Sequence, residues 1–130
     1  MATLLLDTHS YVWALTHPDR LGDAARDAVS DASNRILVSA ASVWEMAIKH
    51  RSGKWPEVER LLADHESLVD RLGGVGLDIT WRHARRAGAL TWDHTDPFDR
   101  MLAAQALTDD VELVTRDSAF AEVHGLRLVW

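Results

Sequence analysis

Short and largely continuous apolar runs, most of them closed by a polar residue, constrain the fold of this chain most strongly. Runs of this kind are typical of strands that are buried on both faces, because an alternating pattern would leave one face in water. We therefore expect a parallel sheet. The clearest runs are TLLLD (3–7), RILVS (35–39), VELVT (111–115) and LRLVW (126–130), and VGLDIT (75–80) is a weaker one.

Helical patterns separate these runs. Apolar residues recur at helical spacing, and cap or stop residues such as Ser39, Gly53, Pro56 and Pro97 mark several of the ends. Alternating strands and helices indicate an α/β fold around a central parallel sheet of four to five strands. The expected helices cover 22–33, 39–51, 56–74, 80–90 and 97–108.

Composition narrows the classes of protein that remain. A length of 130 residues suits one domain spanning 1–130. The absence of cysteine excludes disulfides, zinc–thiolate sites and thiol catalysis. No apolar run reaches membrane-spanning length and the first residues lack a basic signal region, so we expect a cytoplasmic protein without membrane contact. The net charge of −6 disfavours nucleic-acid binding unless clustered acids hold a cation.

Several acids fall where such a cluster would form. Asp7 and Asp117 follow the runs 3–7 and 111–115, Glu45 borders the buried side of helix 39–51, and Asp96 and Asp99 open helix 97–108. Each has a simpler interpretation, because Asp7, Asp96 and Asp117 are also suitable helix or turn caps. If they converge, their hard oxygens favour Mg²⁺ or Mn²⁺, which activates water and stabilises displacement at phosphorus.

Other functional classes fit the chain less well. A receiver-like phosphoacceptor domain needs paired acids after the first strand, and a phosphatase of the DxD type needs a second one two residues later. LLLDTH offers Asp7 alone, followed by Thr8 and His9. We expect His9 and His94 to be polar surface groups, and Trp13, Trp44 and Trp81 to belong to the core or an interface. Trp55, in a loop, suits contact with a partner.

Four ordered segments resemble the PIN-domain ribonucleases, and specifically VapC-type toxins of toxin–antitoxin pairs. LLLDTHSYVWAL is similar to the family's first strand, catalytic Asp and following helix. ILVSAASVWEMAIKHRSGK resembles the segment with the catalytic Glu, and DPFDRMLAAQAL and ELVTRDSAF resemble the third and fourth acidic segments. The resemblance covers nearly the whole chain, and it implies a three-layer α/β sandwich.

The resemblance also assigns roles to residues. It implies that four acids bind the metal and carry catalysis, with Asp99 preferred to Asp96 for the third position. Asp96 is then an accessory acid as well as a helix cap. Thr8 and Ser39 are expected to orient carboxylates or contact phosphate, although capping explains them equally well. Arg100 and Arg116 are expected either to bind RNA phosphate or to pair with the acids. The four metal-binding acids are Asp7, Glu45, Asp99 and Asp117.

The implied activity is that of a metal-dependent endoribonuclease toxin, which hydrolyses RNA phosphodiester bonds with a metal-activated water. The implied cofactor is Mg²⁺ or Mn²⁺. The implied partners are a cognate antitoxin, a second copy of the chain, and RNA in single-stranded or loop regions, with tRNA as one candidate. The alternative that the sequence leaves open is a catalytically weak or inactive PIN-like module, which binds antitoxin or RNA without turnover.

Overall fold

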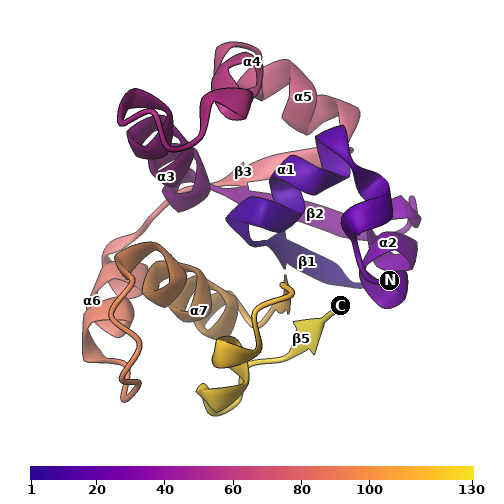
Figure 1. The fold of residues 1–130 in the computed structure, drawn as a ribbon. Coiled ribbons are helices and arrows are strands. Elements are labelled where there is room, and N and C mark those ends of the chain that lie inside the picture. Colours follow the sequence, from indigo (N-terminus) through magenta and orange to yellow (C-terminus); the bar gives the residue numbers. More distant parts are fainter.

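The computed structural model describes residues 1–130, and its centre is a sheet of five parallel strands. The strand order is β3-β2-β1-β4-β5, so the first strand lies in the middle (Figure 1). β1 pairs with β2 on one side through Leu5 and Leu37, and with β4 on the other through Leu5 and Leu113. The strands are β1 (Thr3–Leu6), β2 (Arg35–Ser39), β3 (Gly74–Leu77), β4 (Glu112–Val114) and β5 (Leu128–Val129).

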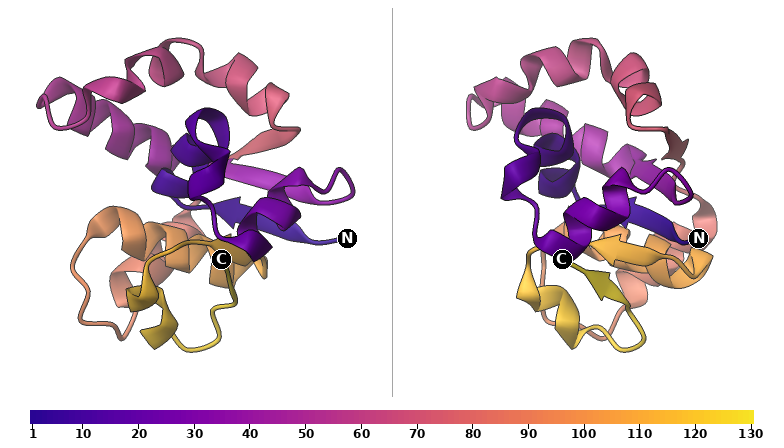
Figure 2. Two further views of the ribbon diagram at one scale, coloured as in Figure 1. Left: turned by 45° about the vertical axis from the view of Figure 1, so that its right-hand side comes forward. Right: turned by 90° about the vertical axis from the view of Figure 1, so that its right-hand side faces the viewer.

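Helices follow the strands and cover both faces of the sheet. α1–α5 lie on one side, and α6 and α7 lie on the other (Figures 1 and 2). Three short 3₁₀ helices, η1–η3, occupy turns. The elements are α1 (Thr8–Thr16), η1 (Pro18–Arg20), α2 (Asp23–Ser30), α3 (Ala40–Arg51), η2 (Pro56–Val58), α4 (Glu59–Ala63), α5 (His65–Arg71), α6 (Trp81–Ala89), α7 (Pro97–Asp109) and η3 (Ser118–Glu122).

The side chains of β1 show why the runs are apolar throughout. Leu4 and Leu6 join one core with residues of α1, α3, α4 and α5, whereas Leu5 joins a second core with Leu102 of α7 and Phe120 of η3. Successive strand residues point to opposite faces, so a strand between two helical layers needs apolar residues at every position. The predicted α/β fold with three layers and a parallel sheet is confirmed.

The two edge strands of the sheet are shorter than the apolar runs that predicted them. The run 126–130 forms only the two-residue strand β5, which pairs with β4 through Leu113↔Leu128 and Val114↔Val129. The run 75–80 contributes β3 at Gly74–Leu77, because β3 pairs with β2 only up to Ser39, where β2 ends. An edge strand is limited by the length of its single neighbour, which its own sequence does not reveal.

The segment 56–74 is not the single helix that its pattern predicts. It begins as η2, continues as α4, and is interrupted at Asp64 (φ −110°, ψ 23°) before α5 begins at His65. The interruption bends the segment into an arch over α3 and α1 (Figure 2). It also places Nδ1 of His65 3.0 Å from the hydroxyl of the fully buried Tyr11, which gives that hydroxyl a hydrogen-bond partner.

None of the helices has the length and apolar character needed to cross a lipid bilayer.

Candidate functional site

All five predicted acids line one small pocket at the carboxyl edge of the sheet. The pocket has a volume of about 160 Å³. The acids come from four different parts of the chain: the end of β1, helix α3, the start of α7 and the loop after β4. This edge is where open parallel sheets bind ligands. The lining residues are Asp7, Thr8, His9, Glu45, Lys49, Asp96, Asp99, Asp117 and Phe120.

Three of the acids are also helix caps. Oδ1 of Asp7 accepts a hydrogen bond from the backbone N–H of Ser10 at 2.8 Å. Oδ1 of Asp96 accepts two, from Phe98 and Asp99, each at 2.9 Å. Asp117 caps η3 in the same way through Ala119. The capping interpretation and the pocket interpretation are therefore both correct for these residues, because one oxygen serves the backbone while the carboxylate still lines the pocket.

Glu45 is held by two neighbours. The hydroxyl of Thr8 donates to its Oε1 at 2.6 Å, and Nζ of Lys49 lies 2.6 Å from its Oε2. Glu45 is buried, so both contacts compensate for lost hydration. The sequence analysis anticipated the orienting role of Thr8 but missed Lys49, although its position four residues after Glu45 is the spacing of a helical ion pair.

Asp99 contacts His94, which is not the isolated surface group that the sequence suggested. Nε2 of His94 lies 2.7 Å from Oδ2 of Asp99, and the His94 ring stacks on Trp92 at a centroid distance of 4.6 Å. Burial, together with the charges of Asp96 and Glu45, raises the pKa of Asp99 to about 6, although the hydrogen bond with His94 acts in the opposite direction. The negative charge of Asp99 is therefore unfavourable in this pocket.

Ser39 has the capping role that was one of its two predicted roles but does not contact the carboxylates, and Thr115 makes a contact that was not predicted. Ser39, expected beside the carboxylates, caps α3 through Ala41 and donates to Oε1 of Gln105 at 2.6 Å. Its hydroxyl is used inside the protein because Ser39 is fully buried. Thr115, which the sequence analysis did not single out, donates to Oδ2 of Asp7 at 2.6 Å. Its signal was its place at the end of a strand that neighbours β1.

Arg100 does not meet either expectation. Its guanidinium donates to backbone carbonyls rather than to an acid: Nε to Ala87, Nη1 to Trp92 and His94, and Nη2 to Leu90, at 2.7–3.1 Å. The rigid fork of five donors suits this role, because it can satisfy several carbonyls of a loop that has no regular structure. Arg100 thus fixes the loop between α6 and α7, which carries His94.

The side chain of Arg116, unlike that of Arg100, remains free to contact a ligand. It is exposed, and it makes no hydrogen bond or ion pair within the chain. It lines a second, more open cavity of about 440 Å³ that shares Asp7 and Asp117 with the acid pocket. Binding of RNA phosphate by Arg116 stays a prediction.

The acid pocket suits a hard divalent cation by its donor chemistry. Its oxygens come from five carboxylates, and a positive charge there would relieve the repulsion of Asp99 by Asp96 and Glu45, which adds to burial in raising the pKa of Asp99. No three His, Asp or Glu side chains of the chain are arranged to hold one ion as the structure stands. Lys49 and His94 instead contact Glu45 and Asp99. An ion would have to compete with Lys49 for Oε2 of Glu45, whereas His94 contacts only Oδ2 of Asp99 and leaves Oδ1 open.

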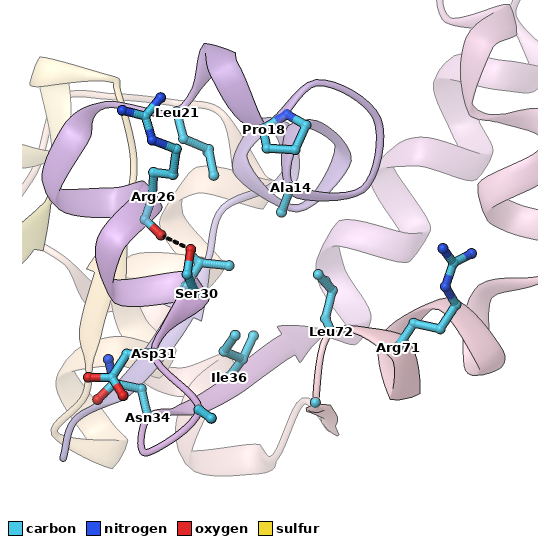
Figure 3. A pocket seen from close by; sticks show the side chains of 13 residues that line it. Ala14, Pro18, Leu21, Arg26, Ser30, Asp31, Asn34, Ile36, Arg71 and Leu72 are labelled. Atoms are coloured by element: carbon cyan, nitrogen blue, oxygen red, sulfur yellow. Dashed lines mark hydrogen bonds between the residues drawn. The ribbon is translucent and has the colours of Figure 1, made fainter.

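A larger cavity, of about 500 Å³, lies away from the acids. It is formed by α1, α2, β2 and the end of α5 (Figure 3). Figure 3 shows apolar side chains such as Leu21, Ile36 and Leu72 around it, and Arg26 and Arg71 directed outward. It contains none of the predicted site residues, so volume alone does not identify the functional site.

Asp96 allows its two roles to be separated by experiment. We expect Asp96→Ala to lower the free energy of unfolding by about 1 kcal/mol, because α7 loses its cap. Asp96→Asn is the matched control, since asparagine caps equally well without the charge. Thermal unfolding and RNA cleavage should be measured for both variants. If Asp96→Asn loses activity at unchanged stability, the charge of Asp96 belongs to the functional site. Equal unfolding temperatures for all three proteins would contradict the capping role.

The fold and the acidic edge together define a class of protein. Comparison with known proteins identifies this class. Residues 4–126 match the family described as PIN domain, and the chain therefore belongs to this family. It is 33% identical over 118 residues to Ribonuclease VapC22 of Mycobacterium tuberculosis, an alignment that covers 90% of this chain and 88% of the relative.

Solved structures share the same fold. VapBC2 of Rickettsia felis, crystallised bound to a DNA fragment from its promoter, superposes with a TM-score of 0.73 at 18% identity, covering 97% of this chain and 96% of the other. DNA-bound VapBC of Salmonella typhimurium gives a TM-score of 0.72 at 21% identity, covering 98% and 97%. At these identities the likeness shows the fold alone.

Proposed function

We propose that this protein is a metal-dependent endoribonuclease and the toxin of a toxin–antitoxin pair. The observation that carries the proposal is the convergence of Asp7, Glu45, Asp96, Asp99 and Asp117 on one pocket, in a PIN-domain chain. The 33% identity to a protein named Ribonuclease VapC22 supports RNA as the substrate. The likeness to VapBC structures supports an antitoxin as the partner.

The proposed cofactor is Mg²⁺ or Mn²⁺, held by Asp7, Glu45, Asp99 and Asp117. When bound, such an ion supplies activation of water and charge stabilisation at the scissile phosphate. The chain's own residues prepare the ligands. Thr115 and the N–H of Ser10 hold Asp7, whereas Thr8 holds Glu45. His94 orients Asp99. These contacts fix the carboxylates before the substrate arrives.

The proposed antitoxin would inhibit by entering the same pocket. A basic side chain suits the five carboxylates, and arginine suits them best because its planar fork can bridge two of them. The exposed Trp44, which packs edge-on against Phe98 and lines a separate cavity with it, provides apolar surface for a partner. We also propose that the 130 residues form one domain, that the protein acts as a homodimer, and that it works in the cytoplasm, where its RNA substrate occurs.

Removal of metal is expected to abolish RNA cleavage. The antitoxin-free protein is incubated with total RNA and Mg²⁺, with and without excess chelator, and the cleaved ends are mapped. Cleavage should disappear with the chelator and return when Mg²⁺ or Mn²⁺ is added in excess, because the ion is expected to supply both the activated water and the charge stabilisation at the scissile phosphate.

The control is Asp7→Asn, which should be inactive under all three conditions. Undiminished cleavage in chelator would exclude the metal-dependent reaction. If RNA stays intact with the antitoxin-free protein in every condition, while the same protein binds antitoxin in a separate assay, the protein is an interaction module without turnover.

A further inference from the structure

A second cavity opens directly beside the acid pocket, and the proposed reaction leaves it unexplained. It has a volume of about 440 Å³, which falls within the usual range for ligand sites of about 300–1,000 Å³. It is lined by Asp7, His9, Trp13, Arg116, Asp117 and Ser118. Asp7 and Asp117 belong to both cavities, so a chain bound at the acids can continue into this space.

One wall of this cavity is aromatic. His9 and Trp13 stand on the first two turns of α1, with ring centroids 5.6 Å apart. The exposed His9 ring in turn stacks on Trp55, at a centroid distance of 4.9 Å and an interplanar angle of 27°. Nζ of Lys49 lies 5.8 Å from the centre of the Trp55 ring. His9 and Trp13 therefore both line the cavity, and Trp55, with Lys49 near its ring, packs against His9.

The same cavity is also lined by a cation without a partner. Arg116 is exposed and has no hydrogen bond or ion pair in the chain, although it follows a strand end beside two carboxylates. Although Asp7 and Asp117 make this cavity acidic, the free guanidinium of Arg116 gives it a group that can bind phosphate. Aromatic rings beside a cation, in an open groove, are the combination that binds single-stranded nucleic acid.

From this arrangement we infer that the cavity is a nucleotide subsite for single-stranded RNA, next to the phosphate that is cut. One base stacks against His9 and Trp13, and Arg116 contacts the phosphate that joins this nucleotide to the scissile position. The inference rests on the proposed ribonuclease function. It adds the recognition of one unpaired nucleotide, by stacking that tolerates any base.

The test compares two probes that carry the same charge. One is a fluorescein-labelled oligoadenylate of about eight nucleotides, within the site sizes of known single-strand binders. The other is a sugar–phosphate chain of equal length without bases. Binding is followed by fluorescence anisotropy with Mg²⁺ present, in an Asp99→Asn background that keeps the probes intact, as verified on a gel.

The variants separate stacking from charge. His9→Ala and Trp13→Leu should weaken binding of oligoadenylate on the order of tenfold and leave the abasic probe unchanged, since stacking needs a base. Arg116→Gln should weaken both probes alike and reduce the salt dependence of binding by about one ion. Trp81→Leu is the matched control, because Trp81 is 86% exposed on α6 and should change neither. Trp13→Phe, which keeps a ring, should restore part of the base-dependent binding if Trp13→Leu loosens the fold.

The result that would overturn the subsite is equal binding of both probes by the parent and by the His9 and Trp13 variants. A surface reserved for a protein segment would give this result. Failure of the parent to bind either probe would also overturn it. Cleavage of total RNA by the chain with Asp99 restored then shows whether the ribonuclease function survives without this subsite.

Discussion

Replacing Asp99 with asparagine is expected to abolish RNA cleavage and, at the same time, to make the metal-free protein more stable. Metal-ion stabilisation of the transition state contributes several kcal/mol, so loss of one ligand should lower activity on the order of 10³-fold. The stability gain follows from the pKa of Asp99, which burial and the neighbouring acids raise to about 6. At pH 7 the wild-type side chain is charged at a cost that asparagine avoids.

The sign of the pH dependence makes this prediction specific. The folded-state pKa lies above the ordinary value of 3.8, so the protonated carboxyl contributes stability below about pH 4, and this contribution is lost as pH rises to about 6. The difference in unfolding temperature between Asp99→Asn and wild type should therefore be small at pH 4 and largest above pH 6. We expect a gap of a few degrees, because about 1 kcal/mol corresponds to roughly 4 °C at this chain length.

Asp93→Asn is the matched control, because Asp93 is an exposed acid in the preceding loop. It should leave both cleavage and the pH profile of unfolding unchanged. Mg²⁺ should raise the unfolding temperature of wild type more than that of Asp99→Asn, since a ligand that binds only the folded state stabilises it. Wild-type cleavage by Asp99→Asn, or a gap that stays constant between pH 4 and pH 7, would contradict this account.

Arg100→Lys is expected to be the most destabilising single change near the site, despite the conserved charge. Lysine has a point charge and cannot reproduce the fork that reaches the carbonyls of Ala87, Leu90, Trp92 and His94. Hydrogen bonds from charged groups contribute about 1.5–3 kcal/mol each, and water can replace some of them. We expect a loss of roughly 2–3 kcal/mol, measured by denaturant unfolding.

The same change should also lower activity, because the loop that Arg100 fixes carries His94, and His94 contacts Asp99. Arg82→Lys is the control, since Arg82 is exposed on the neighbouring α6. It should behave as wild type in both assays. Unfolding of Arg100→Lys at the wild-type denaturant concentration would show that the carbonyl contacts are not important for stability.

Periodic features of the chain were predictable, whereas features that depend on a bend or a loop were not. The runs around Leu5, Leu37 and Leu113 predicted strands because burial on both faces leaves a direct signal in sequence. The break at Asp64 left none, because the leucines on either side keep the helical spacing while the backbone bends between them.

The same division holds within the site. Asp7 and Asp117 were found because the topology of a parallel sheet brings strand ends together. Lys49 was within reach of sequence reasoning through its spacing from Glu45. His94 was not, because its approach to Asp99 depends on a loop shape that Arg100 sets through backbone carbonyls. Carbonyls are present at every residue, so no sequence pattern marks the ones that an arginine selects.

The capping carboxylates have a consequence for the entropy of ligand binding. Asp7, Asp96 and Asp117 each accept a backbone N–H through Oδ1, so their side-chain torsions become fixed when the first turn of the following helix forms. A free aspartate would lose this torsional freedom only on meeting its ligand. Here folding has already removed it, and a cation that enters the pocket encounters oxygens that are ordered in advance. A chain that is still unfolded, by the same reasoning, has neither the helices nor the site.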